Sequence, residues 1–393
     1  MRDVLKDEMF YKTGCDMLRK LCLILIAVAG SGGAPGASAF ETEAQHLFIM
    51  DYDTQAVLVD KNGEEQIPTA SMSKMMTAYV VFTRLKEGRL HLDDDLPVSE
   101  KAWRTQGSKM FVPINARIKV EDLIRGMVVQ SGNDACIVLA EGIAGSEEAF
   151  VRLMNDMAPK LGLNHSHFAN VTGLPDPDHY MTARDLAMLG AHLLRDFPEY
   201  YHYFSEIDFT YNNIKQGNRN PLLYKNSGAD GIKTGHTDEA GFGLTASVKR
   251  GDRRIVMVAT GLTSLKGRSQ EAERIVDYAF REFQNFEIAK PGETVDEADV
   301  WFGDKPKVPL VTAHGLVVSM PAGSRKDMKV TVSYDGPIKA PILAGQELGT
   351  LTVTAPEMPT QSTPLIAGNA VDPLGHVARI GTALSYLIWG SKH

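Results

Sequence analysis

The sequence has few cysteines, no excess of positive charge and no apolar run long enough to cross a bilayer. Its 393 residues include 41 Lys and Arg against 49 Asp and Glu, a formal net charge of −8. Because no basic stripe is available to neutralise phosphates, nucleic-acid binding is excluded. The apolar run at residues 21–29 is too short for a membrane span. Neither H-E-x-x-H nor G-x-x-x-x-G-K occurs, so we expect no metal and no cofactor.

The amino-terminal segment has the pattern of a secretory signal. Arg19 and Lys20 precede the apolar run, and the small-residue stretch after it ends at Ala37-Ser38-Ala39. This order predicts cleavage after Ala39, so we expect residues 1–39 to be a signal peptide. A buried core helix is the alternative, which the charged and Gly/Pro-rich flanks disfavour.

Cleavage at this point bears on the start of translation and on disulfide bonds. Acidic residues before Met17 suit a signal poorly, so either Met1 or Met17 is compatible with the start. Two of the three cysteines leave with the signal, and Cys136 remains alone. A disulfide within the mature chain is therefore excluded, which is ordinary for a protein with a core of this size.

Hydrophobic periodicity predicts a mixed α and β domain over residues 40–290. Short β-rich runs at 46–50 and 56–59 indicate a hairpin. Helical patterns follow as far as about residue 194; they cover residues 71–85, a segment from 133, residues 147–161 and a segment capped by Thr182. The period then changes to two, with strands at 243–248 and 254–259 before a helix at 269–283. We therefore expect an antiparallel sheet that unites the two ends of this segment.

Two further parts follow a Pro-Gly boundary at Pro291-Gly292. Residues 291–370 predict a small all-β domain, because short β-rich runs recur there between Gly and Pro turns; they lie at 316–319, 328–334, 342–343 and 350–353. Residues 371–393 return to a helical period, with an apolar face made by Leu374, Val377, Ile380, Leu384 and Leu387. We expect this last segment to be an amphipathic helix.

Three short motifs occur in order along the chain. They are Ser71-x-x-Lys74, Ser131-Gly132-Asn133 and Lys233-Thr234-Gly235. A chain of this length contains S-x-x-K about once by composition alone, so a single match carries little weight. The three together, in this order and each at the start of a predicted helix or strand, are a much stronger signal.

The first motif has the chemistry of an activated nucleophile. Ser71 at a helix start lies in the positive end of the helix dipole, which favours the oxyanion formed in acyl transfer. Lys74 shares a helix face with Ser71 and could act as its base if burial or a neighbouring cation lowers its pKa. Lys233 is the expected neighbour. An ordinary N-cap serine is the alternative for Ser71.

The other two motifs offer groups that would hold a substrate. Ser131 could relay a proton and Asn133 could bind a substrate amide, although helix capping is the alternative for both. Lys233 and Thr234 could bind a carboxylate; the alternative is a solvated pair on an edge strand. Gly235 weakens a strand, and the usual reason is close approach of another backbone or a ligand.

These motifs resemble those of the low-molecular-mass D-alanyl-D-alanine carboxypeptidases of the penicillin-binding class. The resemblance extends to the sequences around the motifs: Ser-Met-Ser-Lys-Met-Met-Thr at 71–77, Val-Gln-Ser-Gly-Asn-Asp-Ala at 129–135, Asn-x-Thr-Gly-Leu-Pro at 170–175, Asp-Gly-Ile-Lys-Thr-Gly-His-Thr at 230–237 and Trp-Phe-Gly-Asp at 301–304. It covers about residues 40–393. One departure is Ser73, where the family more often has threonine.

The resemblance implies a fold and a set of roles. The fold is α+β: a β-lactamase/transpeptidase-like domain, with an antiparallel sheet between helices on both faces, then a small all-β domain and the C-terminal helix. The implied roles are Ser71 as nucleophile, Lys74 as general base and Ser131 as proton relay, with Asn133, Lys233, Thr234, Gly235, His236 and Arg268 in substrate binding. Arg268 has an alternative as a solvated arginine. The implied reaction releases the terminal D-alanine of peptidoglycan stem peptides, and β-lactams are expected to acylate Ser71.

The resemblance also implies a location at the cell wall. The protein is expected to be periplasmic and bound to the outer face of the inner membrane through its C-terminal helix. A helix packed on the protein, or a dimer contact, is the alternative. A β-lactamase is disfavoured because no E-x-x-L-N follows Ser131, and a non-enzymatic wall-binding module because the motif residues are all present. An endopeptidase or transpeptidase on the same site stays open.

Overall fold

The computed structural model describes residues 40–375, and these form two compact units. The first comprises Thr42–Ile288 and Val317–Arg325. The second takes its described residues from 40–41, Ala289–Leu316 and 326–375. The predicted signal peptide and most of the predicted C-terminal helix lie outside the described residues. Within them, no helix has the length and apolarity that a membrane crossing requires.

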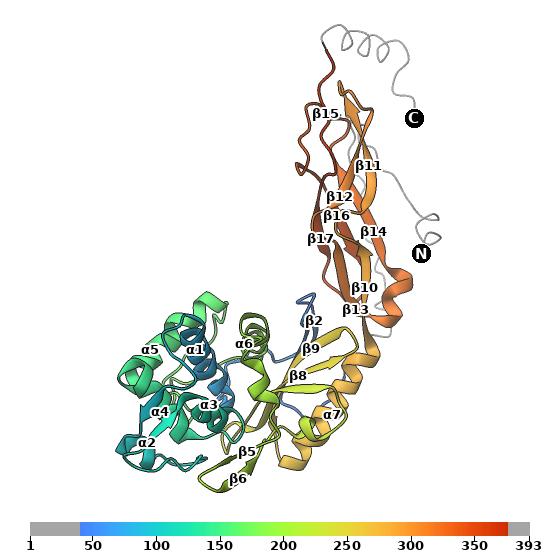
Figure 1. Cartoon of the computed structure of the whole chain (residues 1–393). Helices are drawn as coiled ribbons and strands as arrows, with labels where there is room; N and C mark the ends of the chain where they lie inside the picture. The colour runs from blue at the N-terminus through green and yellow to red at the C-terminus, as the bar shows by residue number, and fades with distance from the viewer. Residues whose placement is uncertain (1–39, 376–393) are drawn as a thin grey trace. The chain divides into compact units, whose positions relative to one another are not determined.

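The first unit is built around a five-stranded antiparallel sheet, counted within residues 40–375 (Figure 1). Its order is β2-β1-β9-β8-β7, with bounds β1 His46–Asp51, β2 Val57–Lys61, β7 Ala229–Thr237, β8 Gly241–Arg250 and β9 Arg253–Leu262. The N-terminal hairpin pairs with β9, for example Phe48 opposite Val258. The prediction that one sheet unites the two ends of this segment is therefore confirmed.

Both faces of this sheet are covered. Residues 255–259 of β9 are all fully buried. Because successive side chains of a strand point to opposite faces, this burial means that both faces of the sheet are packed against other elements. Helix α6, Ala183–Asp196, and helix α7, Leu265–Glu282, lie on opposite sides of β8 and β9 (Figure 1). The predicted cap of α6 is present, because the Thr182 side chain accepts a hydrogen bond from the Asp185 backbone N–H.

Most of the remaining helices pack around α1, Lys74–Lys86, at one end of this sheet. The others are α2 Glu100–Arg104, α3 Val120–Val128, α4 Asn133–Ala144 and α5 Glu147–Met157. Short elements connect them: η1 Ala70–Ser73, η2 Ala158–Leu161, η3 Tyr201–Ser205, η4 Pro221–Tyr224, β3 Asp95–Pro97, β4 Arg117–Lys119, β5 Asp208–Tyr211 and β6 Ile214–Gly217. Met75, Met76 and Phe82 of α1 are fully buried in the core that these helices share with the sheet.

The second unit contains strands and no α-helix among its described residues from Ala289 to Leu316 and from 326 to 375. Its sheet has the order β14-β16-β17-β12-β11-β15, from β11 Thr294–Trp301, β12 Lys307–Thr312, β14 Lys329–Tyr334, β15 Ile338–Lys339, β16 Glu347–Thr354 and β17 Gln361–Ala367. A separate strand pair, which lies almost entirely in the first unit, joins β10 Phe283–Ala289 to β13 Leu316–Pro321, and η5 Ala322–Asp327 follows it. The predicted all-β domain is confirmed.

Local assignments in this part were less accurate than the fold class. The predicted strand at 342–343 is wrong, because Ile342 forms only an isolated bridge with Val371. Strands β11, β12 and β17 were not predicted.

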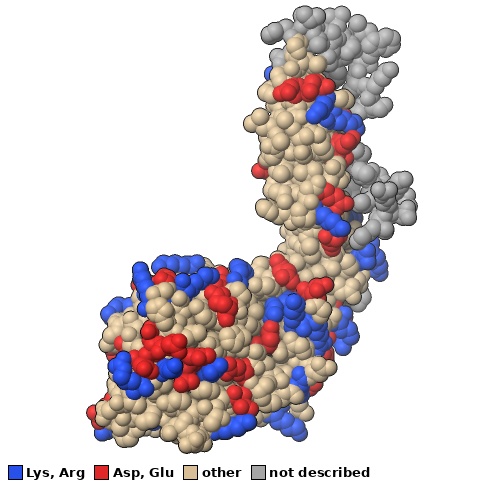
Figure 2. Space-filling model, in the orientation of Figure 1, with Lys and Arg blue, Asp and Glu red and all other residues tan. Residues whose placement is uncertain are grey.

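On the face shown in Figure 2, Lys and Arg are interspersed with Asp and Glu and do not gather into a continuous stripe.

Candidate active site

Ser71 lies in a 3-10 turn that leads directly into α1. The turn η1 spans Ala70–Ser73, and Lys74 is the first residue of α1. The prediction placed Ser71 at the start of the helix, and the structure places it in the turn just before. The Lys74 ammonium donates a hydrogen bond to Ser71 Oγ at 2.8 Å, so the two predicted residues are in direct contact.

Lys74 is buried, and burial controls its protonation. Its Nζ also donates to the Thr172 carbonyl oxygen at 2.5 Å. The pKa of Lys74 is lowered to about 8, chiefly by burial; the positive charge of Arg219 contributes to the lowering, while Cys136 and Asp134 act in the opposite direction. The expected neighbour Lys233 does interact with Lys74, because the charge of Lys74 lowers the pKa of Lys233; Arg219 is a further cation beside Lys74 that was not predicted.

Residues 170–174 form a loop that brings Thr172 to Lys74. Asn170 Oδ1 accepts four hydrogen bonds, from the backbone N–H groups of Thr172, Gly173 and Leu174 and from Thr172 Oγ1, over 2.8–3.2 Å. Gly173 has a φ of 79°, and a Cβ on it would lie 1.9 Å from the Ala70 carbonyl oxygen. Only glycine fits here, because the loop packs directly on the backbone of η1.

The second motif lies at the start of α4. Ser131 has a φ of 68°, which is uncommon outside glycine, and its buried Oγ has no hydrogen-bond partner within the described residues. Asn133 Nδ2 donates to the Gln106 carbonyl oxygen at 2.7 Å. The buried Asp134 carboxylate accepts from the backbone N–H groups of Met110, Phe111 and Val112, at 2.8–3.1 Å. Asp134 thus fixes residues 110–112 against the motif.

The third motif lies on β7, and this strand packs against η1. Lys233 and Thr234 are buried, so the alternative of a solvated edge pair is wrong. A Cβ on Gly235 would lie 2.7 Å from the Thr69 carbonyl oxygen and 3.1 Å from the Ala70 Cβ. The glycine is therefore required by close approach of another backbone, as predicted. Burial, together with Lys74 and Arg219, lowers the pKa of Lys233 well below its ordinary value.

Two arginines add to the positive charge beside Lys233. Arg268 is only 5% exposed, which contradicts the alternative of a solvated arginine. It donates to the carbonyl oxygens of Gly243 and Arg219, at 3.4 and 3.2 Å. Burial and the charge of Arg219 lower the pKa of Arg268 to about 10. These cations lower one another's pKa, so the site is suited to an anion.

His236 differs from the rest of its motif. It follows Gly235 on β7 and is exposed, with its ring stacked on Phe242 at a centroid distance of 3.8 Å.

Sequence reasoning missed Arg219 and the role of the Thr172 carbonyl oxygen as an acceptor for Lys74. Asn170 and Thr172 could have been found from the Asn-x-Thr-Gly-Leu-Pro sequence, whereas no sequence pattern marks Arg219.

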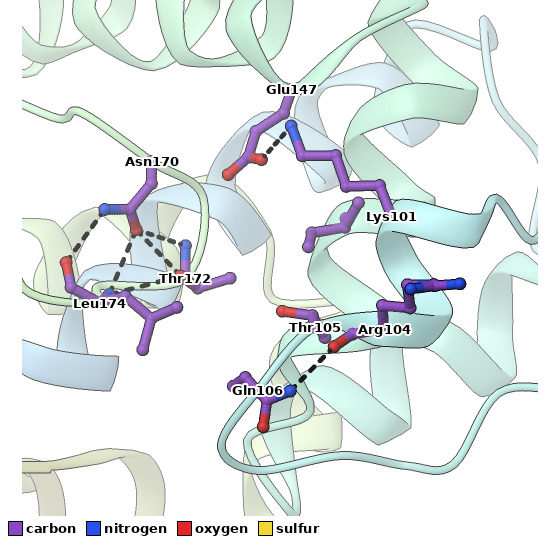
Figure 3. A pocket seen from close by; sticks show the side chains of 9 residues that line it. Lys101, Arg104, Thr105, Gln106, Glu147, Asn170, Thr172 and Leu174 are labelled. Atoms are coloured by element: carbon purple, nitrogen blue, oxygen red, sulfur yellow. Dashed lines mark hydrogen bonds and ion pairs between the residues drawn. The ribbon is translucent and has the colours of Figure 1, made fainter.

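A pocket of about 430 Å³ borders these groups (Figure 3). Its lining is shared by α2 and the segment after it, α4, α5 and the 170–174 loop; the residues are Lys101, Arg104, Thr105, Gln106, Ile137, Glu147, Asn170, Thr172 and Leu174. Figure 3 shows the loop facing the Thr105–Gln106 segment across the pocket. Within residues 40–375, no group of three or more His, Cys, Asp or Glu side chains is placed to hold a metal ion.

Sequence comparison identifies both parts of the chain. The profile of the D-alanyl-D-alanine carboxypeptidase family matches residues 34–263, and that of the penicillin-binding protein 5 C-terminal domain matches residues 283–373. D-alanyl-D-alanine carboxypeptidase DacA of Haemophilus influenzae is 39% identical over 80% of this chain and 81% of its own length. DacC of Escherichia coli is 38% identical over 91% and 92%.

Structural comparison agrees. Penicillin-binding protein 5 from Haemophilus influenzae superposes with a TM-score of 0.78 at 37% identity, covering 86% of this chain and all of that one. Penicillin-binding protein D2 from Listeria monocytogenes, in its ampicillin-bound form, has a TM-score of 0.55 at 26% identity, covering 62% of this chain and all of that one.

The fold and these matches define a serine hydrolase of the penicillin-binding class. Within that class, the chain belongs to the D-alanyl-D-alanine carboxypeptidase family. The predicted α+β domain, the all-β domain after it and the predicted activity, a serine-type D-alanyl-D-alanine carboxypeptidase, are confirmed; the C-terminal helix stays a prediction.

Proposed function

We propose that this chain removes the terminal D-alanine from peptidoglycan stem pentapeptides through an acyl-enzyme on Ser71. The observation that carries this proposal is the contact between Lys74 and Ser71, 2.8 Å from Nζ to Oγ. The pKa of Lys74 is lowered to about 8, chiefly by burial, so about a tenth of the amine is neutral at pH 7 and about half at pH 8. A neutral amine beside a hydroxyl is a competent general base.

The first half of the reaction forms the ester. The Lys74 amine takes the proton of Ser71 as Oγ attacks the carbonyl carbon of the penultimate D-alanine, giving a tetrahedral oxyanion. The intermediate then collapses: the C–N bond breaks, and Ser131 passes a proton from Lys74 to the leaving amine. The buried Ser131 Oγ has no hydrogen-bond partner within the described residues, so its hydroxyl is available for this relay. D-alanine leaves with its new proton.

The second half restores the enzyme. Water attacks the ester carbonyl, Lys74 accepts a proton from the water, and the C–O bond to Ser71 breaks. Ser71 Oγ regains a proton, and the shortened stem peptide leaves as a carboxylate. This step needs no group beyond those that act in acylation.

The cations around β7 orient the substrate. Lys233 and Thr234 bind the terminal carboxylate, Arg268 adds positive charge and Asn133 donates to the peptide backbone. Support comes from the mutual lowering of pKa values among these cations, since an anion would relieve their repulsion. Gly235 lets β7 approach η1, and His236 lies exposed on the same strand with its ring stacked on Phe242.

The same nucleophile would be acylated by β-lactams. A β-lactam presents a strained amide and a carboxylate in place of the terminal dipeptide. The ampicillin-bound and cefotaxime-bound forms of a structural relative support this extension.

The location of the enzyme is part of this proposal. Residues 1–39 would direct export to the periplasm, residues 40–290 and 291–370 would form the catalytic and all-β domains, and residues 371–393 would attach the protein to the outer face of the inner membrane. The signal pattern and the amphipathic spacing of the final segment support this. A protein of residues 40–393 should sediment with anionic vesicles, whereas one of residues 40–370 should not.

The test of the activity is D-alanine release from Nα,Nε-diacetyl-L-Lys-D-Ala-D-Ala by residues 40–393. The parent should release D-alanine and bind a fluorescent penicillin covalently, and Ser71→Ala should do neither. Ser205→Ala, which removes a hydroxyl that donates to the His202 carbonyl oxygen outside the three motifs, is the matched control. A folded parent that releases no D-alanine would overturn the proposal.

A further inference from the structure

Arg268, which the proposed function places at the carboxylate site, is held by weak hydrogen bonds. Its two terminal nitrogens donate to main-chain carbonyl oxygens, that of Gly243 at 3.4 Å and that of Arg219 at 3.2 Å. Both distances lie at or beyond the long end of the usual range. The buried Nε has no hydrogen-bond partner within the described residues. These bonds therefore account for only part of what holds the guanidinium in place.

The aromatic ring of Phe242 supplies a further contact. Arg268 Cζ lies 5.8 Å from the centroid of this ring, which is within the range of a cation–π interaction. Gly243, whose carbonyl oxygen accepts from Arg268, is the next residue in the chain. Two consecutive residues of β8 thus hold the guanidinium, one through its ring and the other through its carbonyl oxygen.

The start of β8 determines where the Phe242 ring lies. Phe242 is directly opposite His236 of β7, and the two rings stack with an interplanar angle of 28°. On the other edge of β8, the pairing with β9 shifts register between Phe242 and Leu244. Irregularities of this kind re-aim side chains next to active sites. The ring is therefore positioned from both edges of its strand.

This position brings Arg268 to the face of β7 that carries Thr234. Successive side chains of a strand alternate between its two faces, so Thr234 and His236 share a face. The Phe242 ring lies on that face as well, because directly opposite residues of an antiparallel pair share one. Arg268 reaches the ring from the first turn of α7. Phe242 would thus act on a substrate through Arg268.

We propose that Phe242 is a positioning residue, whose ring holds the Arg268 guanidinium in the orientation that binds the terminal carboxylate of the substrate. This inference rests on the proposed function, in which Arg268 adds positive charge to that site. An aromatic face attracts a guanidinium without neutralising its charge, whereas a carboxylate partner would neutralise it and compete with the substrate. The guanidinium therefore keeps its charge and its Nε donor for the incoming anion.

The experiment measures D-alanine release from Nα,Nε-diacetyl-L-Lys-D-Ala-D-Ala by residues 40–393 and by variants at Phe242. Phe242→Leu and Phe242→Met keep an apolar side chain but remove the aromatic face, and Phe242→Tyr keeps that face. From the usual strength of cation–π contacts, the leucine and methionine variants should raise KM about three- to tenfold, with little change in kcat. The tyrosine variant should stay near the parent.

A double-variant cycle distinguishes this role from a merely structural one. Arg268→Gln removes the guanidinium, so Phe242→Leu should have no further effect on kcat/KM in that background. In the parent background the same change should lower kcat/KM by the factor expected from KM. Urea unfolding of each variant measures any general loss of stability, which would act in both backgrounds alike.

Phe280 provides the matched control. Its ring lies near two other guanidinium groups, with Cζ of Arg250 at 4.9 Å and of Arg253 at 5.4 Å from the centroid. It belongs to α7, as Arg268 does, but lies about 18 Å further along the helix at 1.5 Å per residue. Phe280→Leu thus removes the same kind of contact away from the site and should leave KM unchanged.

The outcomes separate this proposal from the previous one. A parental KM in the folded leucine and methionine variants would overturn the positioning role and leave the carboxypeptidase reaction standing. An equal loss of kcat/KM with and without Arg268 would overturn it too, as would a tyrosine variant as impaired as the leucine one. A folded parent that releases no D-alanine would overturn the proposed function, and this inference with it.

Discussion

The main-chain carbonyl oxygen of Thr172 lies 2.5 Å from the ammonium nitrogen of Lys74, although 98 positions separate the two residues in sequence. Lys74 therefore has two acceptors, this carbonyl and Ser71 Oγ, in an otherwise buried environment. The hydrogen bonds hold the nitrogen beside the hydroxyl, while burial favours the neutral amine. The geometry and the protonation state of the proposed base thus both depend on the 170–174 loop.

The pH dependence of the reaction should report this buried lysine. Because the base must be neutral, kcat/KM should rise with pH and reach half its maximum near pH 8. Arg219 lowers the pKa of both Lys74 and Lys233, so Arg219→Gln should move this limb to higher pH. Exposed Arg195→Gln is the control. A limb that stays in place in Arg219→Gln would contradict the electrostatic role of Arg219.

The loop itself can be tested at Asn170. Asn170→Ala removes the acceptor of four hydrogen bonds, so the Thr172 carbonyl should no longer be held on Lys74, and kcat/KM should fall about tenfold or more. Asn170→Asp keeps an oxygen acceptor but places a negative charge near Lys74. It should retain more activity than the alanine variant and shift the pH limb upward, because a carboxylate raises a lysine pKa. If the alanine and aspartate variants lost kcat/KM equally and the pH limb of neither moved, the loop would not control the protonation of Lys74.

Close packing of β7 on η1 predicts a cost for any side chain at position 235. Gly235→Ala would place a Cβ 2.7 Å from the Thr69 carbonyl oxygen, a contact that forces the strand or the turn to move. We expect the free energy of unfolding to fall by about 1–3 kcal/mol, and penicillin acylation to slow.

The control for this variant is a glycine-to-alanine change at Gly323 in η5, where an added Cβ meets nothing within 4 Å. Gly323→Ala should leave stability and acylation near those of the parent. Urea unfolding and penicillin-labelling rates measure both effects. Equal behaviour of the two variants would show that the contact at Gly235 does not matter.

His179 links the same loop to acid stability. Its Nδ1 accepts from the backbone N–H groups of Ala169 and Asn170, and burial lowers its pKa to about 4. The folded state therefore binds fewer protons than the unfolded state between about pH 6.5 and pH 4. Stability is thus fully present above this window and is lost as pH falls through it.

The loss attributable to His179 has an upper bound on the order of 3 kcal/mol. His179→Asn keeps an acceptor near the same backbone groups but cannot titrate. Its melting temperature should change less between pH 7 and pH 4.5 than that of the parent or of exposed His202→Asn. An identical pH dependence in all three proteins would exclude His179 as the responsible group.

Patterns that are local in sequence predicted much of the fold. The hairpin at 46–61, the Thr182 cap and helix α7 follow from periodicity and capping, which involve residues only a few positions apart. The all-β domain was predicted from the recurrence of short runs between turns. The strand at 342–343 failed because such short runs are also compatible with a single bridge, and pairing partners decide between the two.

What the sequence by itself determined is the set of reactive groups: a serine with a lysine three positions on, a hydroxyl and an amide at a helix start, and a Lys-Thr-Gly strand. The types of these residues and their spacings can be read directly from the sequence, and they indicated the family before any contact was known. Only the tertiary structure decided how these groups are tuned. The burial of Lys74, its bond to Thr172 and the charge of Arg219 all join segments about one hundred or more residues apart. Contacts of that kind depend on packing of the whole domain, and so a local pattern such as Asn-x-Thr-Gly-Leu-Pro does not state which distant residue it will meet.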